Sequence, residues 1–226
     1  MNWLLVLFLA PLVGAAVVMA LPKSNPTLAK QVGFAFSLLV FAITIVAALR
    51  FDIAAAGDFQ LGFSYDWIPA FGVSFAMGLD GIALVLVALS TSLVPVVLLA
   101  GWDDADGARG SVKGYVALIL VLEAAMIGVF AATDVFLFYV FFEAMLIPVY
   151  FLIGRYGGPR RNYAAVKFLL YSLFGGLLML ASLIGLYVVS ADQNGGTGTF
   201  DFLSLAGLEI DPTTQTREHI GHRQAG

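Results

Sequence analysis

The sequence is divided into long apolar blocks separated by short polar links, and this pattern constrains the fold more than any motif. Each block is about as long as the roughly 20 helical residues that cross the hydrocarbon core of a bilayer. Hydrophobic residues make up 61% of the 226 residues and charged residues only 12%, against about 25% charged residues in ordinary soluble domains. The chain is therefore predicted to be an all-α integral membrane protein.

Six membrane-spanning helices are predicted from these blocks. Their expected ranges are 3–21, 30–50, 79–100, 114–132, 134–154 and 164–190. The first block is too long for the apolar region of a signal peptide and follows no Lys or Arg, so we expect a retained helix rather than a cleaved leader. Residues 1–190 are predicted to form the bundle. Residues 191–226 are predicted to form an external linker, a short interfacial segment and a polar tail.

The link between the second and third helices has the pattern of two paired strands. Large apolar residues alternate with polar or small residues from Phe59 to Trp67, and again from Phe71 to Met77. Pro69 lies in the turn between these runs. The alternation predicts an external β-hairpin, with an aromatic-rich loop on the membrane surface as the alternative. A hairpin would offer a neighbouring subunit an edge or a face for docking.

The basic residues lie mostly on one side of the predicted bundle. The links on that side, with their flanks, carry Lys23, Lys30, Arg109, Lys113, Arg155, Arg160 and Arg161. The opposite side holds Arg50, whereas Arg217 and Arg223 lie too far from a helix end to count much. By the positive-inside rule the basic side faces the cytoplasm, and both termini are predicted to lie outside.

Several classes of redox and metal site are excluded from the chain by its composition. It has no cysteine, and its two histidines, His219 and His222, lie in the final polar tail. Iron–sulfur clusters with cysteine ligands are therefore excluded, and a haem or metal centre within the membrane lacks its usual ligands. No glycine-rich phosphate loop follows a strand, so binding of NADH or a nucleotide by this chain is unsupported. No nucleic-acid partner is predicted.

One carboxylate interrupts the fifth apolar block. Glu143 is the ninth of the nineteen residues from Val135 to Ile153 and the only charged residue among them. An ionised carboxylate at the bilayer centre costs at least about 2.5–3.5 kcal/mol. Such a group stays protonated, pairs with a cation or contacts internal water, and each of these makes it responsive to protons. A proton-relay or ion-binding role is therefore favoured, with a neutral glutamate that joins helices by a hydrogen bond as the alternative.

Two further residues are candidates for the same chemistry. Glu123 lies midway along the fourth block, and two carboxylates at the same depth in adjacent helices could share a water-filled cavity and exchange protons. For Glu123, a role in joining helices is an equal alternative. Lys167 lies near the cytoplasmic start of the sixth helix. It either extends its ammonium to the membrane surface or tunes a carboxylate and receives a proton.

Small and capping residues give weaker signals. Asp80 and Asp134 precede the third and fifth helices and are predicted to be N-caps. Ser172 and Gly176 have the small-xxx-small spacing that is typical of helix packing in membranes. Pro148 follows Glu143 by about one turn and frees a backbone carbonyl nearby.

Residues 134–158, "DVFLFYVFFEAMLIPVYFLIGRYGG", and the following "RRNYAAVKFLLYSLFGGLLMLASLIGLY" resemble the chain M family of bacterial NADH–quinone oxidoreductase, respiratory complex I. The mitochondrial counterpart of this family is subunit 4 of NADH dehydrogenase. The resemblance covers roughly residues 3–208. It implies an antiporter-like, proton-translocating subunit of the membrane arm, in a bacterial inner membrane.

The resemblance also implies roles for single residues. The glutamate of "FFEAMLIP", Glu143, matches a central member of the family's proton path. Glu123 and Lys167 match a glutamate and a lysine that the family often carries. NADH, FMN, iron–sulfur clusters and quinone are expected in partner subunits rather than in this chain, and the expected partners are the other membrane-arm subunits and the lipid bilayer.

This chain departs from the family in its length. Family members continue into a seventh helix with a lysine and into later helices with further charges, so the chain resembles the N-terminal portion of such a subunit. Two alternatives remain. The first is a subunit of a multisubunit sodium/proton antiporter, built on the same fold. The second is a non-transporting assembly or scaffold protein, for which neutralising Glu143 changes the yield of complex but not the transport by each complex.

Overall fold

The computed structural model describes residues 2–22, 24–103, 111–193 and 196–208. Its long helices are α1 (Trp3–Ala20), α2 (Pro26–Arg50), α3 (Gly81–Ala100), α4 (Val112–Ala131), α5 (Val135–Tyr156) and α6 (Arg161–Gln193). All six are long and apolar enough to cross a membrane. The predicted class, an all-α membrane protein with six spanning helices, is confirmed.

Three helices, α2, α4 and α6, begin earlier than the apolar pattern predicted, at Pro26, Val112 and Arg161. Helix α2 starts at Pro26 because Asn25 caps it, with the Asn25 side chain accepting a hydrogen bond from the backbone N–H of Leu28 (3.2 Å). Proline at the first helical position suits this start, since its missing N–H needs no partner there. Helix α6 begins at Arg161, inside the polar link. Six residues discussed above lie outside the described residues: Lys23, Arg109, Arg217, His219, His222 and Arg223.

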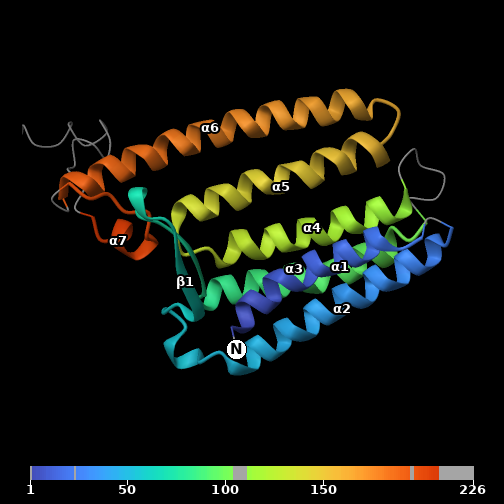
Figure 1. Ribbon diagram of the computed structural model, residues 1–226, viewed down its shortest axis with the longest axis horizontal. Coiled ribbons are helices and arrows are strands. Elements are labelled where there is room, and N and C mark those ends of the chain that lie inside the picture. The colour runs from blue at the N-terminus through green and yellow to red at the C-terminus, as the bar shows by residue number, and fades with distance from the viewer. Residues whose placement is uncertain (1, 23, 104–110, 194–195, 209–226) are drawn as a thin grey trace, which may run out of the picture.

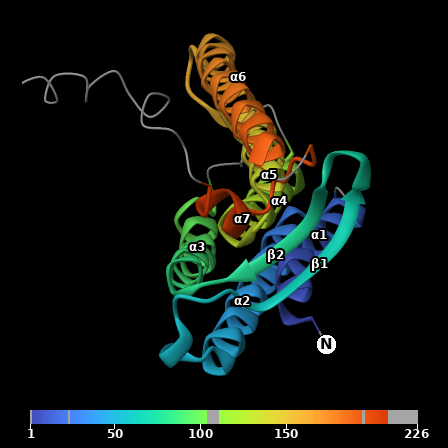
Figure 2. The same ribbon diagram turned by 90° about the vertical axis from the view of Figure 1, so that its left-hand side faces the viewer.

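Helix α4 forms the centre of the bundle. It packs against α1, α2, α3 and α5, whereas α6 packs mainly against α5. Figure 2 shows the result: α4, α5 and α6 follow one another away from the cluster of α1, α2 and α3. In the apolar stretch of α4, 56% of the residues are buried, whereas the corresponding shares are 17% in α5 and 11% in α6. The core therefore lies around α4, and the α5–α6 pair extends from one side of it.

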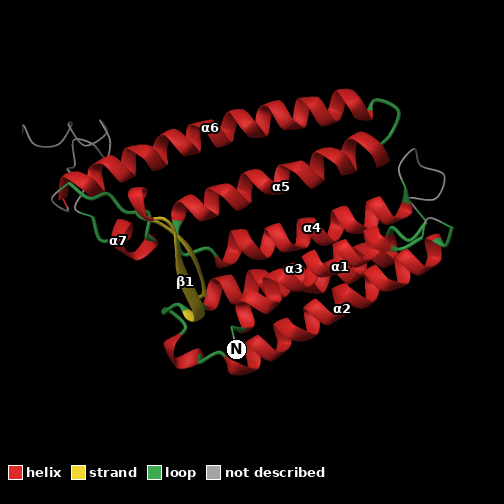
Figure 3. Cartoon of the chain, viewed as in Figure 1, coloured by secondary structure: helices red, strands yellow, loops and turns green. Residues whose placement is uncertain are grey.

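The link between α2 and α3 forms an antiparallel hairpin of β1 (Gln60–Ile68) and β2 (Val73–Leu79), in which Tyr65 pairs with Phe75. Pro69–Phe71 form a 3₁₀ turn, and Gly72 closes it with φ of 63°. Glycine suits this left-handed conformation because it lacks a Cβ. The predicted hairpin is confirmed. It lies across one end of the helices, as the yellow strands of Figure 3 show.

The turn between α4 and α5 is tied to the hairpin on one side and to the segment before α7 (Phe202–Ala206) on the other. The N–H of Thr133 donates to the carbonyl of Ala76 in β2 (3.0 Å). The N–H of Val135 donates to the carbonyl of Phe200 (2.9 Å), and the N–H of Phe202 donates to the carbonyl of Thr133 (3.0 Å). Three connections far apart in the sequence are thus joined at one end of the bundle, on the left of Figure 1.

Candidate functional site

The two predicted glutamates lie at the same depth. Glu123 is eight residues before Ala131, the last residue of α4, and Glu143 is eight residues after Val135, the first residue of α5. At 1.5 Å per residue, each carboxylate is about 12 Å along its helix from the turn that joins the two helices. The two acids are therefore both remote from the ends of their helices, as predicted.

Glu123 is completely enclosed by protein. Its exposed fraction is 0%, and neither Oε1 nor Oε2 has a hydrogen-bond partner in the described part of the chain. Nearby residues of α4 belong to different apolar clusters: Leu120, about one turn before Glu123, belongs to one, and Ala124, directly after it, belongs to the other. Glu123 thus places a carboxyl group within the most tightly packed helix of the molecule, without the partner that buried polar groups normally have.

Glu143 is half-buried and lies between α5 and α6. Its Oε1 atom is buried and has no hydrogen-bond partner among the described residues. The carboxyl group lies directly against Gly176 of α6, so closely that a Cβ on Gly176 would overlap Oε1. The sequence indicated only that Ser172 and Gly176 permit close helix packing. The structure shows that the group packed against Gly176 is a carboxylate, which the spacing of small residues does not reveal.

Lys167 is separated from both glutamates. It precedes Gly176 by nine residues, which is two and a half helical turns, so the two residues lie on opposite sides of α6 and about 14 Å apart along its axis. Its exposed Nζ lies 5.9 Å from the ring centroid of Tyr163 and 5.8 Å from that of Tyr171. Within the described ranges no ion pair joins it to a glutamate. The structure therefore brings Glu143 to α6 but does not bring Lys167 to Glu143.

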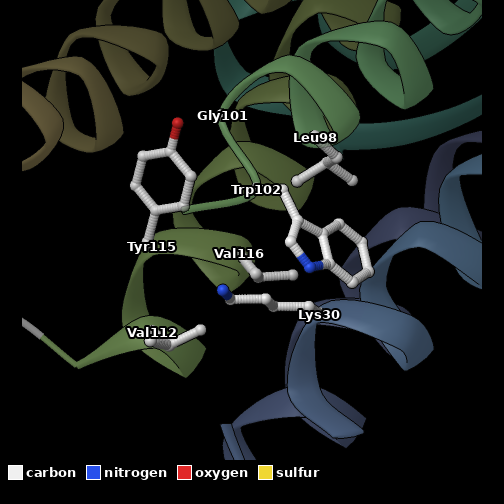
Figure 4. A pocket seen from close by; sticks show the side chains of 7 residues that line it. All are labelled: Lys30, Leu98, Gly101, Trp102, Val112, Tyr115 and Val116. Atoms are coloured by element: carbon white, nitrogen blue, oxygen red, sulfur yellow. The ribbon is translucent and has the colours of Figure 1, made fainter. Parts of the chain in front are cut away.

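A different charged cluster lies at the opposite end of the bundle from the hairpin. Lys30 of α2 is 8% exposed, and its Nζ forms an ion pair with Oδ1 of Asp103 (3.4 Å). The same ammonium lies 5.7 Å from the centre of the Trp102 ring. Figure 4 shows Lys30, Trp102 and Tyr115 around one small pocket. These contacts attach the end of α3 to the start of α2, and this cluster lies away from the level of the two glutamates.

Asp134 links the hairpin to α5. Its Oδ1 accepts from the N–H of Leu137 (3.0 Å), which confirms the predicted N-cap, and its Oδ2 accepts from the N–H of Ser74 in β2 (2.9 Å). Asp80 likewise caps α3 through the N–H of Ala83 (2.6 Å). Burial raises the pKa of the Asp134 carboxyl above its ordinary value, although hydrogen bonds from Ser74, Leu137 and Phe136 act in the opposite direction.

Comparison with known proteins finds similar membrane subunits. The family model described as "NADH:quinone oxidoreductase/Mrp antiporter, TM" matches residues 132–215, a range that contains Glu143, Lys167 and Gly176. NADH-quinone oxidoreductase subunit M of Mycobacterium tuberculosis is 48% identical and covers 90% of this chain, which spans 41% of that protein. NADH-ubiquinone oxidoreductase chain 4 of Arabidopsis thaliana is 38% identical over 79% of this chain and 35% of its own length.

Two solved structures are similar in three dimensions. A chain of respiratory complex I from Thermus thermophilus with bound NADH superposes with a TM-score of 0.75 at 28% identity, over 93% of this chain and 40% of that one. A chain of the Mrp complex from Dietzia gives 0.70 at 22% identity, over 95% of this chain and 22% of that one. The second likeness shows a shared fold alone.

The fold, the family model and the identities define a class of protein, the antiporter-like membrane subunits. Within that class the chain belongs to the family of NADH-quinone oxidoreductase subunit M and its chain 4 counterparts. It spans between 35% and 42% of the length of the curated relatives named as subunit M or chain 4.

Proposed function

We propose that this chain is part of a proton-translocating membrane-arm subunit of NADH-quinone oxidoreductase, in which Glu143 takes up and releases a proton. The observation that carries the proposal is the Glu143 carboxyl itself, deep in a spanning helix and packed against a neighbouring helix, with Oε1 lacking a hydrogen-bond partner in the described part. A carboxyl so placed in the membrane marks an ion or proton pathway by default. The named relatives support the same assignment.

The electron-transfer steps are assigned to other subunits. NADH, FMN, the iron–sulfur clusters and quinone belong to partners in this proposal, and this chain has no redox site of its own. It binds the other membrane-arm subunits and the lipid bilayer. Its charged residues, rather than a cofactor, couple electron transfer in the other subunits to proton movement. Electron transfer elsewhere would change the local potential at Glu143 and so change its proton occupancy.

Glu123 and Lys167 are proposed as secondary participants. Glu123 reaches the same depth as Glu143 in the adjacent helix, so water between the helices would allow proton exchange between the two acids. Lys167 lies nearer the basic end of the bundle and on the other side of α6. It would act on Glu143 through intervening groups or water, and we expect its influence to be weaker than that of Glu143 itself.

The distribution of cations supports a proposed orientation. Except for Arg50, the Lys and Arg residues that the structure describes gather at the end of the bundle opposite the hairpin. These residues are Lys30, Lys113, Arg155, Arg160, Arg161 and Lys167. By the positive-inside rule this end faces the cytoplasm of a bacterial cell, with the hairpin and the N-terminus outside the inner membrane. Residues 1–190 are proposed to form the membrane bundle and residues 191–226 an external extension, of which 194–195 and 209–226 lie outside the described residues.

The test is Glu143→Gln in the full-length subunit within the assembled complex. Glutamine keeps the shape of the side chain but cannot exchange a proton, so we expect proton translocation in sealed vesicles to fall by about tenfold or more, with the amount of complex unchanged. Asp66→Asn, which makes the same chemical change at an exposed hairpin position, is the matched control. Wild-type translocation per electron by Glu143→Gln would show that the proposed role is wrong.

A second candidate, a subunit of a sodium/proton antiporter, is favoured by the shared fold with the Mrp complex. It predicts sodium-dependent proton exchange that persists without NADH. The same Glu143→Gln measurements also address a scaffold role, which predicts less assembled complex but normal transport by each complex. Transport assayed with and without sodium, and normalised to assembled complex, separates the three.

A further inference from the structure

Helix α6 contains two consecutive glycines with different surroundings. A Cβ on Gly176 would overlap Oε1 of Glu143 and would lie 2.8 Å from its Cδ and 3.4 Å from its Oε2. These are the three nearest atoms, and all belong to one carboxyl group. A Cβ on Gly175 would have no heavy atom of the described residues within 4 Å, apart from its adjacent residues and the nearby backbone of its own helix. Of these two positions, only 176 therefore lacks the space for a side chain, because the Glu143 carboxyl occupies it.

Gly176 lies on the side of α6 that faces α5. The buried residues of α6 are Ala165, Gly176, Leu183 and Ser190, and their spacing of eleven, seven and seven residues keeps them on one side of a helix with 3.6 residues per turn. Glycine within a helix is less favourable than alanine by about 1 kcal/mol, so a glycine on the buried side calls for a compensating contact. Here the Glu143 carboxyl occupies the volume that a side chain at 176 would fill.

We propose that Gly176 is a positioning residue for Glu143: the absence of a side chain there allows the carboxyl group to lie against the α6 backbone, between α5 and α6. This inference rests on the proposed function, because it names the residue that fixes where the proton is held. A methyl group at 176 would displace the carboxyl from that place while leaving its chemistry intact. Transfer of a proton depends on short, well-directed hydrogen bonds, so a displacement of about 1 Å is sufficient to slow it strongly.

The experiment compares Gly176→Ala with Gly175→Ala in the full-length subunit of the assembled complex. Both changes add one methyl group to the same helix, and both replace glycine by a better helix former. We expect Gly176→Ala to lower proton translocation by each assembled complex about tenfold. Gly175→Ala is expected to translocate protons at the wild-type rate, since its methyl group contacts nothing in the described structure.

A second comparison tests whether the effect acts through Glu143. Glu143→Asp shortens the side chain by one methylene and withdraws the carboxyl from the space next to Gly176. We therefore expect Gly176→Ala to reduce translocation strongly in the Glu143 background but by less than about twofold in the Glu143→Asp background, a non-additivity expected of residues in contact. A purely structural effect of the methyl group on helix packing would reduce translocation equally in both backgrounds.

Each outcome bears on the inference. Normal translocation by Gly176→Ala, or an equal loss whichever residue occupies position 143, overturns it. If Gly176→Ala prevents assembly, the inference requires that Glu143→Asp or Glu143→Ala restore the amount of complex, and no recovery overturns it. Failure of the proposed function appears in a different place, as normal translocation by Glu143→Gln, so the two failures are distinguishable.

Discussion

Helices α4 and α5 carry the same chemical group at the same depth, but they hold it in contrasting surroundings. Glu123 lies in the helix around which four others pack, and it is fully buried. Glu143 is half-buried on α5, which packs against both α4 and α6, and its carboxyl group lies against Gly176 of α6, a helix with mostly exposed sides. The first carboxyl is surrounded by close-packed core, and the second lies at the contact between two helices at the side of the bundle.

The two sites differ in what it costs to place a carboxyl group within the membrane. At Glu123 the surrounding side chains are fixed by contacts on several sides, so the carboxyl can be accommodated only at the expense of packing and hydrogen bonding. At Glu143 one glycine provides the space, and small movements of α6 relative to α5 would change the surroundings of the carboxyl. This difference suits Glu143 to respond to events elsewhere in a complex, and it can be tested by changing each region in turn.

Added volume is expected to be poorly tolerated between α4 and α5. A Cβ on Gly128 would lie 2.7–2.8 Å from three ring atoms of Phe141, so Gly128→Ala forces the ring or the helix to move. We expect a loss of about 3 kcal/mol in the free energy of unfolding, the upper end for overpacked cores, measured by titrating the full-length subunit with SDS in mixed micelles.

Gly185→Ala on α6 is the matched control for Gly128→Ala. A Cβ there has no heavy atom within 4 Å, so the change is expected to be neutral or to stabilise the helix by up to about 1 kcal/mol. Equal destabilisation by the two substitutions would mean that α6 is packed as tightly as α4 in the full-length subunit, and the contrast between the two regions would not hold.

Much of this arrangement could be predicted from the sequence. The six spans, the hairpin, the caps at Asp80 and Asp134 and the similar depth of Glu123 and Glu143 all follow from local pattern, length and count. The order of helix packing does not, because the apolar sides of membrane helices are chemically alike. That Glu143 faces Gly176 rather than Lys167 depends on the rotation of α6 about its axis, which tertiary contacts determine.

Replacing Glu123 by leucine is expected to stabilise the bundle rather than weaken it. Leucine fills a similar volume and removes two buried oxygens that have no hydrogen-bond partner among the described residues, which is worth about 1–2 kcal/mol. Proton translocation is expected to fall in the same variant. Unfolding in SDS and translocation by the assembled complex give the two readouts.

Glu123→Gln, which keeps two polar atoms at the same place, is the control for Glu123→Leu. Its stability is expected to remain within about 0.5 kcal/mol of wild type. If Glu123→Leu instead destabilised the subunit, the carboxyl would be making a hydrogen bond that holds helices together. Glu123 would then be a structural residue, and Glu143 and Lys167 would remain in the proposed pathway.

The smallest effect concerns the turn that joins the two regions. Asp134 is 2% exposed, and its carboxyl is an acceptor for N–H groups of β2 and α5. Because burial raises its pKa above the ordinary value of 3.8, the folded state binds the proton more tightly than the unfolded state. The stability that this group contributes is therefore fully present below pH 3.8 and is lost as pH rises through the raised pKa.

Asp134→Asn tests this sign, because asparagine caps a helix about as well as aspartate but does not titrate. We expect the unfolding free energy of wild type to decline by less than about 1.4 kcal/mol for each unit by which the pKa is raised, and the decline to be absent in Asp134→Asn. Asp201→Asn removes a neighbouring negative charge that contributes to the raised pKa, so it should reduce the decline without abolishing it. A decline of unchanged size in Asp134→Asn would assign the pH dependence to another group and leave the joint between α4 and α5 insensitive to protons.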